Sequence, residues 1–249
     1  MKSRLLIFAI LAAALPVLGQ PRPPDLVPSP GAKTPEEAAK PDVKKIDETK
    51  YQIGDVTFDE KYREIRFPAK VNMTEGNLEY LIVRAPMGKL HESLLSTEIS
   101  ATDLNVAFKL LRYPASRELY ALPNKTGGIS GDFPDVPADV KAGARIAIDV
   151  EWQQEGTTKR VPINDWVQQE VKGQAMPAGP WVYGGSDFND GKFIPEVTGD
   201  IAAIFVSGYS LIVYPGKDNG DDEVWIPYPK RVPATETAVT VIIAPQKKP

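Results

Sequence analysis

The chain has 249 residues, of which 33 are acidic and 29 basic, and it contains one histidine and no cysteine. The absence of cysteine excludes a disulfide framework, a thiolate zinc site and an iron–sulfur cluster held in the ordinary way. The formal net charge of −4, without a basic patch interleaved with aromatic residues, argues against a nucleic-acid partner, because phosphates bind to basic surfaces.

The first nineteen residues have the parts of a secretory signal peptide. Lys2 and Arg4 form the positive region, residues 5–15 form an apolar run, and Gly19 is small enough for cleavage before Gln20. A helix that crosses a bilayer needs about 20 apolar residues, so this run is too short and cleavage is favoured over a retained anchor. The sequence therefore predicts export to the periplasm or the exterior of a bacterium.

Residues 20–50 are predicted to be a disordered, proline-rich linker. They carry few large apolar side chains, so burial cannot offset the entropy of ordering them, and proline removes backbone donors. A simple spacer is favoured over a ligand for a proline-binding domain.

Residues 51–249 are expected to form a single domain. No segment in it reaches transmembrane length, so no membrane span is expected after signal removal.

Short alternating runs separated by turns dominate the sequence from residue 51 onwards, which is typical of strands. Residues 144–152 alternate most regularly, and the turn Glu155-Gly156 predicts a hairpin with residues 159–163. The other expected strands cover residues 53–58, 64–71, 78–84, 90–99, 181–183, 200–206, 210–214, 223–226 and 238–244.

One main helix is predicted over about residues 102–112. Leu104 and Phe108 begin a pattern with the spacing of a helix face, and Thr102 or Asp103 can serve as its N-cap. The elements together indicate a mainly β or α+β fold. We expect an antiparallel, β-sandwich-like single domain with this helix packed on a sheet.

The single histidine, His91, lies in a segment whose polar residues are the main candidates for ligand binding. If residues 90–99 form a strand, alternation places His91 and Ser93 on one face and Glu92 on the other, directly after Lys89. Histidine exchanges a proton near neutral pH and is a common metal ligand. A histidine that only fixes a turn through hydrogen bonds is the simpler interpretation. Apart from a metal at His91, no cofactor is expected.

Acidic turns supply a weaker candidate for metal binding. Asp218, Asp221 and Asp222 gather oxygen ligands in a short segment, as do residues 187–191, but neither segment has the spacing of an EF-hand loop. Asp and Asn next to Gly are chiefly turn formers. A metal site at these aspartates, separate from the candidate at His91, therefore stays an alternative to a solvated turn.

Aromatic residues raise a third kind of site. Exposed flat rings in an exported β domain would favour sugar binding, whereas rings inside strand patterns favour a role in the core. The sequence favours the core for Trp152 and Trp181. The tryptophans concerned are Trp152, Trp166, Trp181 and Trp225.

Several short motifs follow one another in order along the predicted domain. They are Thr74-Glu75-Gly76, Leu78-Glu79, Gly88-Lys89-Leu90-His91-Glu92-Ser93, the helix around residues 107–111, Val150-Glu151-Trp152, Asp165-Trp166-Val167, Pro180-Trp181-Val182-Tyr183-Gly184-Gly185-Ser186, Gly199-Asp200-Ile201, Arg231-Val232-Pro233 and Val239-Thr240-Val241. In this ordered series the chain resembles the YdjY-domain family of exported bacterial proteins. The resemblance implies a structural motif that consists of Trp152, Asp165, Trp166, Trp181, Gly184 and Gly185.

The resemblance supports the β-rich fold and export but implies no particular activity. The chain departs from the family pattern at Leu90, where a threonine is usual, and at Tyr183, where a phenylalanine is usual. The first departure removes a hydroxyl beside His91, which weakens any ligand site that needs that group.

Three functions follow as hypotheses. The sequence favours a non-enzymatic, exported domain that binds an unidentified protein or another envelope component, because it contains no phosphate-binding glycine loop, no cysteine and a single histidine. The first alternative is a metal or small-ligand site, with possible catalysis, centred on His91 with Lys89, Glu92 and Ser93. The second alternative is a carbohydrate-binding module.

Overall fold

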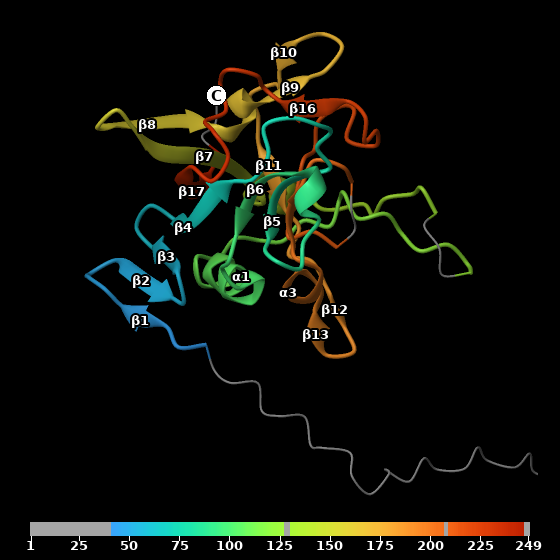
Figure 1. Cartoon of the computed structure of the whole chain (residues 1–249). Coiled ribbons are helices and arrows are strands. Elements are labelled where there is room, and N and C mark those ends of the chain that lie inside the picture. Colours follow the sequence, from blue (N-terminus) through green and yellow to red (C-terminus); the bar gives the residue numbers. More distant parts are fainter. Residues whose placement is uncertain (1–40, 127–129, 207–208, 247–249) are drawn as a thin grey trace, which may run out of the picture. The chain divides into compact units, whose positions relative to one another are not determined.

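The computed structural model describes residues 41–126, 130–206 and 209–246 (Figure 1). The predicted signal peptide and the linker up to residue 40 lie outside these residues. Strand β1 (Lys44–Lys45) pairs with β2 (Lys50–Ile53). Strands of the described residues therefore begin before residue 51, where the sequence placed the beginning of the domain.

The chain is mostly β, as predicted, with a few short helices. The remaining strands are β3 (Val56–Asp59), β4 (Glu64–Val71), β5 (Tyr80–Arg84), β6 (Ser93–Thr97), β7 (Arg145–Gln154), β8 (Thr157–Pro162), β9 (Val167–Gln169), β10 (Gln174–Ala175), β11 (Trp181–Tyr183), β12 (Phe188–Asn189), β13 (Lys192–Phe193), β14 (Asp200–Ala203), β15 (Ile212–Val213), β16 (Trp225–Pro227) and β17 (Ala238–Pro245). The helices are α1 (Ala101–Leu110), α2 (Ala138–Gly143) and α3 (Ile194–Thr198), with single 3₁₀ turns η1 (Leu90–Glu92) and η2 (Ile163–Trp166).

Eight strands close into a barrel, so the predicted sandwich is wrong. The ring runs β4-β17-β7-β11-β15-β14-β5-β6, and β6 returns to β4 through the pairs Lys70↔Ser96 and Val71↔Leu95. Most pairs are antiparallel, but β5–β6 and β14–β15 are parallel. Alternation of buried and exposed residues is the same in a sandwich and in a barrel, which is why the sequence pattern did not separate the two.

The core fills the inside of this ring. In β7 the apolar side chains of Ile146, Ile148 and Val150 alternate with more exposed residues, as the sequence predicted, and all three are buried. They share one cluster of buried residues with the inward side chains of the neighbouring strand β17. Period-two alternation thus gives each strand one face for the core and one for solvent.

The predicted main helix exists but begins earlier than expected. The hydroxyl of Ser100 accepts the N–H of Asp103 at 3.1 Å and is the N-cap of α1. Glu196 of α3 accepts the next free N–H, that of Thr102, at 2.9 Å. Leu104 and Phe108 are buried in the main core cluster, so α1 is joined to the barrel by its apolar face.

A smaller sheet lies outside the ring. Strand β9 pairs with β10 on one side and with β16 on the other, all antiparallel. Figure 1 shows these three strands together near β7 and β8. Within the described parts of the chain, no helix has the length and apolarity needed to cross a membrane.

Candidate functional site

The His91 segment is a crossover that runs outside the barrel. Because β5 and β6 are parallel, the chain must return along the outer face of β5 before β6 can begin. Gly88 contacts that strand directly: a Cβ on Gly88 would lie 2.4 Å from the Cβ of Val83. Leu90 packs beside Tyr80 and Val83 in a small apolar cluster. These contacts fix the path of the turn up to Leu90. The residue that follows, His91, faces outward.

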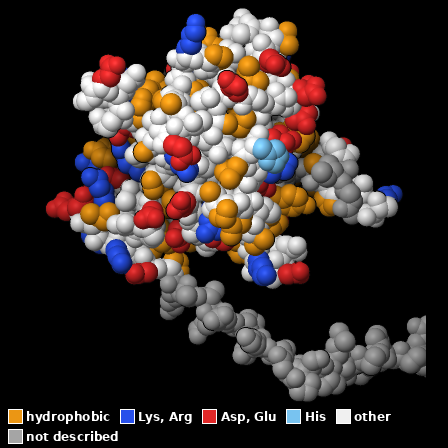
Figure 2. Space-filling view, in the orientation of Figure 1, with side chains coloured by type: hydrophobic (Ala, Val, Ile, Leu, Met, Phe, Trp, Pro, Cys, Tyr) orange, Lys and Arg blue, Asp and Glu red, His pale blue; other side chains and the backbone are white. Residues whose placement is uncertain are grey.

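The prediction that His91 and Ser93 share a strand face is wrong. Residues 90–92 form the 3₁₀ turn η1, and the His91 side chain is 75% exposed. Ser93 is the first residue of β6, is fully buried and donates its hydroxyl to the carbonyl of Leu95 at 2.8 Å. Figure 2 shows the single histidine at the surface beside acidic and basic side chains. A ligand that reaches His91 therefore does not reach Ser93.

Lys89 is held by two carboxylates. Its Nζ lies 2.8 Å from Oε2 of Glu79 and 3.3 Å from Oε2 of Glu92, and it stands 5.6 Å from the centre of the Tyr80 ring. The hydrogen bond with Glu79 is the main cause of a raised pKa for the Lys89 amine. Lys89 therefore acts as an ionic link between the turn and Glu79, the residue before β5.

Two buried groups under the turn have shifted pKa values. Burial, followed by the negative charge of Asp200, raises the pKa of the Tyr80 hydroxyl to about 12. Burial also raises the pKa of Asp200, although a hydrogen bond with Thr198 and the charge of Lys89 oppose this effect. The two groups belong to β5 and β14, so the turn covers a partly polar patch of the barrel wall.

Asn72 is a positioning residue that the sequence did not reveal. Its Nδ2 donates to the carbonyl of Leu90 at 2.5 Å and to the carbonyl of Ser93 at 2.7 Å. The side-chain amide thus ties both ends of η1 to the residue that follows β4. An asparagine after a strand usually indicates a turn, and nothing in the local sequence links it to a segment some twenty residues later.

Replacing Asn72 with alanine should loosen the turn without unfolding the domain. The substitution removes two hydrogen bonds and leaves two acceptors unpaired, which costs about 1–2 kcal/mol. We expect faster hydrogen exchange at the Glu92 amide, which donates to the carbonyl of Lys89. Asn189→Ala, at an exposed position, is the control. Equal exchange rates at Glu92 in both variants would contradict this role of Asn72.

A metal site would have few ligands. His91 Nε2 lies 3.5 Å from Oε1 of Glu92, and the described residues include no group of three or more acidic or histidine side chains that could hold a metal ion. Asp218, Asp221 and Asp222 are exposed in a turn, where Asp221 accepts the N–H of Glu223 at 3.0 Å. The structure thus does not bring His91 and these aspartates together as one metal centre.

None of the four tryptophans is exposed. Trp166, Trp181 and Trp225 are buried, and Trp152 is half-buried with its ring centre 5.0 Å from that of Trp166. Sugar binding on flat surface rings needs an open ring face. These positions therefore favour a structural role, as the sequence suggested for Trp152 and Trp181. Asp165 is half-buried in η2.

The glycine pair of the sequence motif is also structural. Tyr120 donates its hydroxyl to the carbonyl of Ser210 at 2.6 Å and accepts the N–H of Ser186 at 3.0 Å. A Cβ on Gly184 would lie 2.1 Å from this hydroxyl oxygen. Gly185 has a φ of 81°, in the left-handed region that favours glycine. The pair thus lets the chain pass directly beside the Tyr120 side chain.

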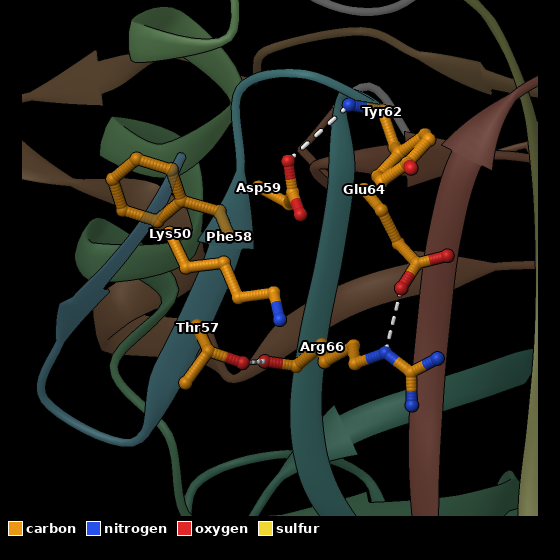
Figure 3. A pocket seen from close by; sticks show the side chains of 7 residues that line it. All are labelled: Lys50, Thr57, Phe58, Asp59, Tyr62, Glu64 and Arg66. Carbon is orange, nitrogen blue, oxygen red and sulfur yellow. Dashed lines mark hydrogen bonds and ion pairs between the residues drawn. The ribbon is translucent and has the colours of Figure 1, made fainter. Parts of the chain in front are cut away.

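A groove of about 520 Å³ lies at the β2, β3 and β4 strands (Figure 3). Its charged side chains have partners within the chain. Glu64 Oε1 lies 2.6 Å from Arg66 Nε, and Asp59 accepts the N–H of Lys61 at 2.9 Å. Lys50 forms an ion pair with Asp47 at 3.5 Å. This groove is therefore a self-neutralised polar surface. The residues that line it are Lys50, Thr57, Phe58, Asp59, Tyr62, Glu64 and Arg66.

Comparison with known proteins gives one informative match. No curated protein and no solved structure matches the chain. The family model described as the YdjY domain matches residues 56–244, which include the barrel strands up to the last residue but one of β17 and the turn that presents His91. Since the match spans most of the sequence, the chain belongs to the YdjY domain family.

Proposed function

We propose that this protein is an exported binding module without enzymatic activity of its own, and that it contacts a protein or envelope component through residues 87–92. One observation supports this proposal most strongly. The turn is fixed to the barrel at several points, yet two of its side chains, Met87 and His91, face solvent, with Met87 53% exposed.

The fixed turn suits recognition because its shape is set before a partner arrives. Asn72 binds both ends of η1, Lys89 joins it to Glu79, and Leu90 packs on the barrel wall. A preorganised surface loses less conformational entropy on binding than a flexible loop does. Methionine is also enriched in the cores of protein interfaces. Export of the domain is part of the proposal and rests on the signal-like residues 1–19.

Site-specific cross-linking tests the proposed surface. A photoactivatable side chain at position 87 should give a defined adduct in cells that produce the full chain. The same group at position 171, where Val171 is 89% exposed, should give none. Excess wild-type protein should compete for the adduct, and the Met87→Ala/His91→Ala variant should compete poorly. Equal adducts at both positions, or equal competition by both proteins, would overturn the proposal.

A second candidate is a metal or small-ligand site at His91. The observation that favours it is the proximity of an exposed imidazole to the Glu92 carboxylate. Two ligands on one turn are fewer than the three or four protein ligands that transition-metal sites usually have. In this candidate the partner or solvent would have to complete the coordination, so we rank it below partner binding.

A further inference from the structure

The connection between β15 and β16 contains Asn219-Gly220, and Asn219 is the one asparagine of the chain that a glycine follows. Residues 217–220 form a turn in this connection, with Asn219 half-buried and Gly220 exposed. We propose that Asn219 is a site of spontaneous covalent modification in the folded protein. Its side-chain amide is converted to a carboxylate, and this change releases the turn from the neighbouring strands.

The chemistry requires only Asn219, Gly220 and water. The backbone nitrogen of Gly220 loses its proton to solvent and forms a bond with Cγ of Asn219, and the side-chain nitrogen leaves as ammonia. The product is a five-membered succinimide ring. Water then opens the ring at either of its carbonyl carbons, which gives aspartate or isoaspartate at position 219. A glycine favours ring closure because no side chain hinders the approach of its backbone nitrogen.

The attacking nitrogen of Gly220 is free to react. Its N–H donates no hydrogen bond within the residues that the structure describes. A Cβ on Gly220 would meet no atom within 4 Å, so the space around this residue is open. Asn189 in β12 is exposed as well, but the residue that follows it, Asp190, carries a side chain beside its nitrogen. Asn219 therefore combines an unhindered nucleophile with an exposed turn.

Asn219 holds the turn at two points, which gives the modification a structural consequence. Its Nδ2 donates to the carbonyl of Tyr214, directly after β15, at 2.9 Å, and its own carbonyl accepts the N–H of Val206 at 2.7 Å. The nitrogen bound to Tyr214 is the one that leaves as ammonia. In the aspartate product a carboxylate oxygen would face the Tyr214 carbonyl, and neither group can donate a hydrogen. The new negative charge also joins those of Asp218 and Asp221 in the same segment. The modified turn therefore does not regain its original contacts.

Ageing of the purified protein tests the site. After incubation of the folded chain near neutral pH, digestion at mildly acidic pH and mass spectrometry should show that OH has replaced NH₂ at Asn219, as aspartate and isoaspartate. Acidic digestion prevents the reaction during preparation. Gly220→Ala should slow the reaction by about tenfold or more, because the added Cβ hinders ring closure. This variant should fold, since the Cβ meets no atom. Asn189 is the internal control and should react far more slowly.

Asn219→Asp reproduces one product and tests the release of the turn. Hydrogen exchange at the Val206 amide should become about tenfold faster, the effect expected when one hydrogen bond is lost. Asn189→Asp adds the same charge at an exposed position on another hairpin and should leave this rate unchanged. The proposal is overturned if Asn219 stays unmodified in the folded protein while the urea-unfolded chain reacts, if Gly220→Ala reacts as fast as the wild type, or if both aspartate variants exchange alike at Val206.

Discussion

Replacing Trp181 with alanine should lower the free energy of unfolding by about 3–5 kcal/mol, the usual cost of removing a large buried aromatic side chain. Trp181 is fully buried on β11, and its ring centre lies 5.4 Å from that of Tyr214. The substitution also leaves Oδ1 of Asn164 without the indole donor. Denaturation by urea, followed by circular dichroism, measures the change through the midpoint and the slope of the transition.

Two further variants make this result interpretable. Trp152→Ala removes a half-buried ring and should cost clearly less than Trp181→Ala. Trp181→Phe keeps much of the buried volume and should retain a measurable transition if the alanine variant does not fold. A cost for Trp181→Ala no greater than that for Trp152→Ala would show that β11 contributes less to the core than its burial indicates.

Gly184→Ala should destabilise the domain by about 2–3 kcal/mol, near the upper end for overpacked sites. The new methyl group would overlap the Tyr120 hydroxyl oxygen, which the ideal Cβ approaches to 2.1 Å. Tyr120 must then move, and its hydrogen bonds with Ser210 and Ser186 lengthen or break. Thermal or urea unfolding measures the loss. The conformational preference of glycine is not the cause, because Gly184 is not among the residues with positive φ.

Gly220→Ala is the matched control for this change. A Cβ at position 220 would meet no atom within 4 Å, so the substitution should change stability by less than about 0.5 kcal/mol. In a Tyr120→Phe background, which removes the atom nearest to the new methyl group, Gly184→Ala should cost less than in the wild type. Equal costs in both backgrounds would argue against the contact with Tyr120 as the cause.

The sequence predicted the local elements better than their arrangement. The β7–β8 hairpin follows from strict alternation and the Glu155-Gly156 turn, and the structure confirms it. The strand predicted over residues 90–99 is wrong in its first part, since η1 covers residues 90–92. Leu90 resembles a strand residue because it is apolar, but it packs on the outside of the barrel. The parallel pairing of β5 and β6, which requires the crossover, is a long-range property.

In the candidate sites, too, the sequence predicted local features but not the contacts that depend on long-range strand pairing. Lys89 and His91 were accessible to sequence analysis because a single histidine in a polar turn is conspicuous. Asn72 and Asp200 were missed, since each reaches the turn only when β4 and β14 take their places in the ring. The motif glycines 184 and 185 were identified as structural. Their partner, Tyr120, lies more than sixty residues earlier, so the sequence could not supply the reason.

The position of the last strand has a consequence for how the protein is made. Residues 238–245 form β17, which lies between β4 and β7, so a strand that is synthesised after both of them joins their two edges. Until it emerges from the ribosome, β4 and β7 each have an open edge that can pair with other chains. The barrel is therefore completed only after residues 238–245 have been synthesised.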